Sequence, residues 1–208
     1  MEKVLDLYTQ PYDPNRPVVC MDETPKQLIS ETKQPLPMKP GRPLRYEHHY
    51  RREGVCNLFL FFEPLVGQRH IVVRTRRTTK DWVYCVKSIV DDWYKEAEVV
   101  RIVLDNLSTH KPAAFYEYFD PAEAKRLLDK LEFYFTPKHA SWLNMAEIDF
   151  SVLSRQCLNQ RIPSRDLLEQ HVSAWVTSRN AQVGTVDWHF TTGDARIRLK
   201  RLYPSYSH

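Results

Sequence analysis

Three carboxylates that lie far apart in the sequence are the side chains of this chain that could do chemistry together. Asp22 follows the apolar run at residues 18–21, Asp105 follows the run at 99–104, and Glu147 lies in a stretch with helical spacing. If the two runs are adjacent strands, their ends lie about 5 Å apart, and a helix crossing that end brings the glutamate to the same place. Carboxylates gathered this closely repel one another strongly, so they must take up protons or bind cations.

Hard oxygen ligands of this kind favour Mg²⁺ or Mn²⁺ over zinc. Two such ions about 3.5–4 Å apart can hold the attacking and leaving oxygens of an in-line phosphoryl transfer. The pattern therefore predicts a two-metal phosphoryl-transfer site at Asp22, Asp105 and Glu147. Considered singly, each residue also has an ordinary explanation, because aspartates often cap turns and most helix glutamates are solvated.

The segment that must position Glu147 has three parts. Residues 131–136 form an apolar, aromatic run of strand length, Pro137 ends that strand, and a loop with two basic groups and a tryptophan follows. Apolar residues then recur at three- and four-residue steps, which places them on one helix face: Leu143, Ala146, Phe150, Leu153 and Cys157. At about 100° per residue, Glu147 lies roughly 80° from the middle of that face, where its carboxylate can reach over the end of a sheet.

The order of the other expected elements determines the sheet. Strands are predicted at residues 18–21, 50–62, 69–75, 99–104 and 131–136, after an irregular lead-in at 1–16. Helices are predicted from Thr78 or Thr79 to about Ala97, at 112–130 with a break at Asp120, from about Leu143, after Ser164, and after Thr191 or Thr192. Closely spaced strands form an antiparallel meander, whereas strands separated by helices become parallel neighbours. The predicted fold class is therefore α/β, with a mixed five-stranded sheet (an antiparallel meander plus two parallel strands) flanked by helices.

A basic, proline-rich segment at residues 33–46 is inserted after the first strand. Four prolines in residues 35–43 exclude a helix or an inner strand there. Its cations Lys39, Arg42 and Arg45 could belong to a solvated connector, to an arm along a phosphate backbone, or to a contact with a second protomer. The charge run at residues 196–201 is likewise open between a solvated face and a DNA contact.

Size and composition indicate one soluble domain. The chain has 208 residues and a net charge of +4, so it can bury a core and is mildly basic, which permits a nucleic-acid partner without proving one. The four cysteines are far apart and three lie inside apolar runs, as buried thiols in a reducing cytosol do. No run is long enough to span a membrane, and the first residues lack the apolar core of a signal peptide. We therefore expect a cytoplasmic protein with no membrane partner.

Three blocks, VVCMDET, IVLDNLSTHKP and FYFTPKHASWLNMAEIDFSVLSRQCL, resemble the DDE transposases of the mariner superfamily, and above all its bacterial insertion sequence 630 family. With the tail WHFTTGDARIRLKRLYP, the resemblance covers residues 17–204. It implies an RNase H-like fold with Asp22, Asp105 and Glu147 as the metal-binding triad. Asn106 and His110 match the motif beside the second aspartate as supporting residues. The loop before the glutamate matches at Lys138, His139, Trp142 and Asn144, which we expect to contact DNA.

The implied chemistry is metal-dependent hydrolysis at a transposon end, followed by attack of the freed 3′-hydroxyl on target DNA. Its partners would be the DNA ends, the target and a second copy of the chain, acting at the bacterial nucleoid. Such transposases normally carry helix-turn-helix modules ahead of the catalytic domain, whereas about 16 residues precede the first strand here. We therefore expect no such module in this polypeptide, with end recognition supplied by another reading frame or lost by truncation. The step from Asp105 to Glu147 is also longer than in compact mariner members.

Two other functions fit the same residues. An RNase H-like nuclease would hydrolyse DNA without strand transfer, and strand-transfer products would distinguish it from a transposase. A non-catalytic DNA-binding or dimerisation remnant of a mobile element would bind DNA in a salt-sensitive way without binding a divalent metal. The intact triad argues against such a remnant.

Overall fold

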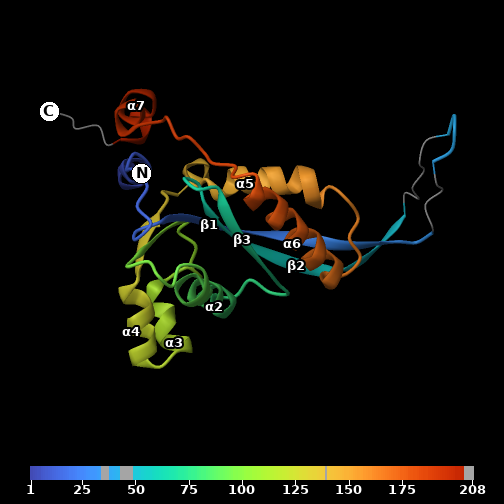
Figure 1. Cartoon of the computed structure of the whole chain (residues 1–208), viewed down its shortest axis with the longest axis horizontal. Coiled ribbons are helices and arrows are strands. Elements are labelled where there is room, and N and C mark those ends of the chain that lie inside the picture. Colours follow the sequence, from blue (N-terminus) through green and yellow to red (C-terminus); the bar gives the residue numbers. More distant parts are fainter. Residues whose placement is uncertain (34–37, 43–48, 139, 204–208) are drawn as a thin grey trace.

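The computed structural model describes residues 1–33, 38–42, 49–138 and 140–203. Its centre is a five-stranded sheet in the order β3-β2-β1-β4-β5 (Figure 1). The strands are β1 (Val18–Glu31), β2 (Tyr50–Glu63), β3 (Gln68–Arg74), β4 (Val100–Leu104) and β5 (Leu131–Phe135). β1, β2 and β3 pair antiparallel, whereas β4 pairs parallel with both β1 and β5. The predicted mixed sheet, an antiparallel meander plus two parallel strands, is confirmed.

Helices cover both faces of this sheet, as Figure 1 shows, with α5 and α6 on one face and α2, α3 and α4 on the other. The α-helices are α1 (Glu2–Tyr8), α2 (Thr79–Ser88), α3 (Phe115–Tyr118), α4 (Pro121–Asp129), α5 (Ala146–Leu153), α6 (Arg165–Ala181) and α7 (Thr192–Arg198). No helix in the described ranges is long and apolar enough to cross a membrane.

The start of β1 separates the two halves of the core. Val18 and Cys20 pack into the cluster that contains Leu153 of α5, whereas Val19 and Met21 pack into the cluster that contains Trp82 of α2. This alternation follows from the two-residue period of a strand and explains why the run at residues 18–21 is continuously apolar.

The irregular lead-in predicted at residues 1–16 is wrong, because residues 2–8 form α1. Val4, Leu5, Leu7 and Tyr8 are buried. A helix of seven residues is marginal by itself in water, so its stability comes from tertiary packing that local sequence signals do not report.

The prediction that the first strand ends on Asp22 is also wrong. β1 continues to Glu31, pairing along its length with β2, and Asp22 is opposite Leu60. β1 pairs with β4 only as far as Cys20, so the rest of β1 has no neighbouring strand from β4 on that side. A strand with an open side tolerates a proline, and Pro25 lies there. Beyond the body of the molecule, β1 and β2 form a projecting hairpin (Figure 1).

The predicted helix caps are largely confirmed. Thr78 and Asp81 form a capping box at α2, Thr191 and Asp194 form one at α7, and the Ser164 hydroxyl accepts a hydrogen bond from the Leu167 amide at α6. The helix expected to run to Ala97 is shorter, because α2 ends at Ser88 and is followed by one π-helical turn, Ile89–Trp93. The break expected at Asp120 separates α3 from α4.

Candidate active site

Asp22 of β1 and Asp105, the residue directly after β4, lie on neighbouring segments of the sheet. The pairing of Val18 with Arg101 and of Cys20 with Val103 has a constant offset, which places Asp22 level with Asp105 two residues further on. Cys20 and Val103 both belong to the core cluster on the α5 side of the sheet. By strand alternation, Asp22 faces that same side, and Asp105, directly after β4, continues the pattern set by Val103.

The start of α5 is attached to β1 beside Asp22. The side-chain amide of Asn144 donates a 2.8 Å hydrogen bond to the Met21 carbonyl, and its oxygen accepts one of 3.2 Å from the Ala146 amide. These bonds fix the first turn of α5, which contains Glu147, against the strand that carries the first aspartate. Asn144 is only 1% exposed, so its predicted DNA contact is wrong in this structure. Its hydrogen-bonding groups are used inside the protein.

The charges of Asp105 and Glu147 act on the carboxyl of Asp22. Burial, together with the charges of Asp105, Glu147 and Glu23, raises the pKa of Asp22 to about 7, although a 2.8 Å hydrogen bond from the Glu23 amide acts to lower it. A carboxyl in this environment favours either a proton or a nearby cation.

His110 supports Asp105 from inside the protein. Its Nδ1 lies 2.9 Å from Asp105 Oδ1 and its Nε2 lies 3.8 Å from Glu23 Oε2, while the ring stacks on Trp82 with centroids 5.3 Å apart. Burial alone would lower the pKa of His110, but the hydrogen bond to Asp105 and the nearby charges of Asp105 and Glu23 raise it to about 9. A pKa above neutrality favours the protonated imidazole, which can donate to the Asp105 carboxylate. Asn106, the next residue along the chain, is exposed.

The carboxylates of Asp22, Asp105 and Glu147 are suitable ligands for a hard divalent ion, although they are not close enough together to coordinate one. Within the described ranges, no group of three or more histidine, cysteine, aspartate or glutamate side chains is gathered closely enough to hold a metal. The fit rests on the chemistry of the donors, three carboxylates whose mutual repulsion a cation would offset. Ligation would require these side chains to move closer together.

The remaining predicted DNA contacts lie on the surface or outside the described residues. Lys138 is exposed after β5, and Lys39 and Arg42 are exposed and joined by a backbone bridge near the end of the hairpin. Arg45 and His139 fall outside the described residues. Trp142 is 40% exposed and stacks with Trp188 at a centroid distance of 6.4 Å. Their contact with DNA stays a prediction.

A buried ion pair that sequence reasoning missed fixes α5 from its other side. Asp149, two residues after Glu147, accepts a 2.9 Å hydrogen bond from Arg69 Nε, and the two side chains are 3% and 0% exposed. The same guanidinium donates to the Gly67 carbonyl and to the Asn180 side chain, and it lies 4.9 Å from the centre of the Phe62 ring. Only the fold brings these residues together, because they are 80 positions apart in sequence.

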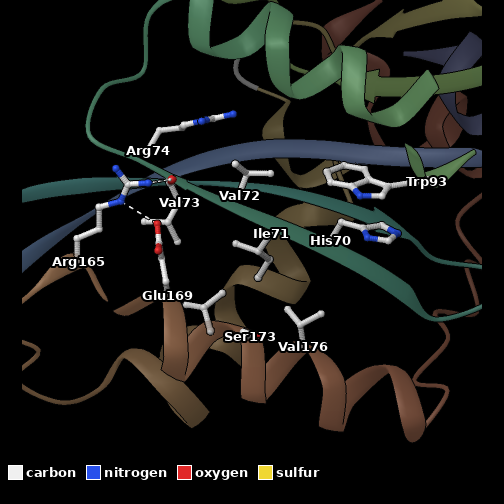
Figure 2. Close-up of a pocket in the computed structure, with 11 residues that line it drawn as sticks. His70, Ile71, Val72, Val73, Arg74, Trp93, Arg165, Glu169, Ser173 and Val176 are labelled. Carbon is white, nitrogen blue, oxygen red and sulfur yellow. Dashed lines mark hydrogen bonds and ion pairs between the residues drawn. The ribbon is translucent and has the colours of Figure 1, made fainter. Parts of the chain in front are cut away.

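A hollow of about 440 Å³ between β3 and α6 lies away from the carboxylates (Figure 2). Arg165 crosses it, donating to the Val73 carbonyl at 3.3 Å and to Glu169 at 2.7 Å. These contacts cover part of the open edge of β3, which would otherwise invite pairing with another strand. None of Asp22, Asp105 and Glu147 lines this hollow, so it is not part of the candidate active site.

Comparison with known proteins gives a family and a fold. The family model described as DDE superfamily endonuclease matches residues 17–169. Among solved structures, the Mos1 mariner paired end complex with Mn has a TM-score of 0.56 at 14% identity, covering 88% of this chain and 54% of that one. The Mos1 strand transfer complex has a TM-score of 0.57 at 13% identity, covering 88% and 53%. The chain thus spans about half the length of these structures, and a comparison with curated proteins finds no match.

Proposed function

This chain belongs to the DDE superfamily endonuclease family, and on that premise we propose that it is the catalytic domain of a metal-dependent DNA transposase. One arrangement carries the proposal: the register of β1 and β4 runs toward Asp22 and Asp105, and Glu147 lies in the helix turn that Asn144 attaches to β1. The electrostatic coupling of Asp22 to both other carboxylates supports it.

Asp22, Asp105 and Glu147 would hold two Mg²⁺ or Mn²⁺ ions. Such ions, when bound, activate a nucleophile and stabilise the charge that develops at the phosphorus during phosphoryl transfer. His110 and Asn144 act as positioning residues, because His110 hydrogen-bonds Asp105 and Asn144 attaches the start of α5 to β1. These contacts support Asp105 and the start of α5, and the three carboxylates would move closer together when the metal binds.

The substrates in this proposal are transposon ends and target DNA. The paired end and strand transfer complexes of Mos1 have the same fold, and this likeness motivates the choice of substrate and of a homodimer as the acting form. The exposed cations Lys39, Arg42 and Lys138 are the first candidates for phosphate contacts. A further DNA-binding module would recognise the particular end sequence, and the reaction would take place at the bacterial nucleoid.

The test uses the purified chain, Mn²⁺ and a DNA fragment carrying the sequences that flank its own gene. We expect nicks at the ends and joined products formed from the freed 3′-hydroxyl, both reduced to background by Asp105→Asn. Nicks without joined products would identify a nuclease instead. Salt-sensitive DNA binding without either product, and without Mn²⁺ binding by calorimetry, would identify a non-catalytic remnant and overturn the proposal.

A further inference from the structure

A second groove lies between β1 and the end of α5, the two elements that carry Asp22 and Glu147. It measures about 450 Å³, and its walls include Thr24 and Lys26 of β1 and Ser154 and Arg155 of the helical segment that follows Leu153. None of the described residues that line it is acidic. The groove is therefore lined by cations and hydroxyl groups, which suits an anion.

The position of the groove follows from the way α5 lies along β1. Asn144 attaches the start of α5 to Met21, and Lys26 Nζ donates a 2.6 Å hydrogen bond to the Leu158 carbonyl beyond its end. Strand alternation puts Thr24 and Lys26 on the same side of β1 as Asp22. Ser154, seven residues after Glu147, lies on the same side of the helix as that glutamate.

The positive charge in the groove is not neutralised by ion pairs. Lys26 Nζ bonds the backbone carbonyls of Leu158 and Gln160, and it pairs with no carboxylate in the described ranges. Arg155 is exposed and forms no hydrogen bond or ion pair with any residue that the structure describes. Arg165, ten residues later, differs because it pairs with Glu169 at 2.7 Å. Arg155 is thus free to bind an external anion.

We infer that this groove binds the phosphate backbone of the DNA strand on one side of the phosphate that reacts, with Arg155 and Lys26 as the phosphate ligands. The inference rests on the proposed function and adds a substrate-binding site to it. At about 1.5 Å per helical residue, Arg155 lies about 12 Å beyond Glu147 along the helix. Since one DNA strand carries a charge every ~3.4 Å of helix axis, the distance from Glu147 to Arg155 corresponds to about three phosphates. Such contacts fix the register of the strand without reading its sequence.

The test measures binding of a fluorescent DNA duplex of mixed sequence by anisotropy, without divalent metal, over a range of salt concentrations. Arg155→Ala should weaken binding several-fold and reduce the slope of log Kd against log salt by about 0.9, the value for one lost phosphate contact. Ser154→Asp, which places a negative charge in the groove, should weaken DNA binding more than Arg155→Ala does. Wild-type affinity and slope in Arg155→Ala would overturn the inference.

The matched control is Lys95→Ala. Lys95 is 67% exposed and precedes β4, so it lies at the opposite end of that strand from Asp105, and its removal should change neither affinity nor slope. An equal loss in this control would show that only net charge matters and would also overturn the inference. Asp105→Asn separates the two proposals, because it should abolish nicking while leaving the Arg155 effect intact. If the wild-type protein binds DNA through Arg155 but never cleaves it, only the proposed function fails.

Discussion

Asn144 donates a 2.8 Å hydrogen bond to the backbone carbonyl of Met21, so the turn that begins α5 is attached to β1 one residue before Asp22. This single amide connects the helix that carries one acidic residue of the candidate site to the strand that carries another. Helix and strand are 123 positions apart in sequence at this contact. The relative placement of Asp22 and Glu147 therefore depends on a side chain that has no acidic or basic character of its own.

Replacing Asn144 by alanine should reduce activity more than DNA binding. The change leaves the Met21 carbonyl without its buried partner, which we expect to lower the free energy of unfolding by about 1–3 kcal/mol. Because α5 is then less firmly held, kcat for nicking should fall while KM for DNA changes little. Asn15→Ala, at an exposed asparagine before β1, is the control and should behave as wild type. Equal kinetics in both variants would exclude a positioning role for Asn144.

Asp22→Asn, Asp105→Asn and Glu147→Gln should each abolish Mn²⁺ binding in calorimetry and leave the circular dichroism spectrum unchanged. Each amide keeps the shape of the side chain but removes one negative charge from a group of repelling carboxylates, so the fold is not expected to suffer. A variant that still bound Mn²⁺ with wild-type affinity would remove that residue from the metal site.

Breaking the buried pair of Arg69 and Asp149 should destabilise the protein strongly. Arg69→Met leaves the Asp149 carboxylate buried without its cation, and such a loss typically costs about 3–5 kcal/mol, measurable by urea unfolding. The exposed pair of Lys125 and Asp129 provides the comparison, since Lys125→Ala should cost less than about 1 kcal/mol. Similar losses in the two variants would contradict the structural importance of the buried pair.

Glu63 should make stability depend on pH. Burial raises the pKa of this carboxyl from 4.5 to about 7, so the folded state holds the proton more tightly than the unfolded chain does. Stability is therefore lost as pH rises from about 4.5 through 7, and Glu63→Gln, which removes this ionisation, should raise the free energy of unfolding at pH 8 by on the order of 1–3 kcal/mol.

Toward pH 5 the advantage of Glu63→Gln should shrink, because the wild-type carboxyl is then mostly protonated when folded. Thermal unfolding at several pH values provides the measurement. Glu96→Gln, at a side chain that is 91% exposed, should show no such trend. A difference between Glu63→Gln and wild type that stayed constant from pH 5 to pH 8 would rule out Glu63 as the source.

Local patterns in the sequence were sufficient to predict the sheet and the segments that carry the candidate site. The run at residues 18–21 is apolar at every position because it packs on both faces, and this is visible without any structure. Thr78 and Ser164 predict the starts of α2 and α6, because each is an N-cap residue whose side chain bonds a backbone amide three residues later. The adjacency of the strands that lead to Asp22 and Asp105 follows from strand order, although β1 does not end at Asp22 as predicted.

Long-range interactions could not be predicted in this way. Asp149 looks like a solvated helix residue until Arg69, 80 positions earlier, is placed against it. Asn144 resembles a loop residue available to DNA, yet its partner is a backbone carbonyl on a distant strand. The continuation of β1 past Asp22 depends on pairing with β2, and the helix at residues 2–8 depends on packing against the rest of the core. In each case the stabilising partner is remote in sequence.

The first and last α-helices, α1 and α7, pack side by side (Figure 1). Glu2 accepts hydrogen bonds of 2.7 and 2.9 Å from Arg196, and Asp6 accepts one from the Thr192 hydroxyl. Val4 of α1 and Ala195 of α7 are buried in the same cluster, so neither helix can detach without exposing the other. The two helices should therefore fray as one cooperative unit, so that loosening one lowers the stability of the other.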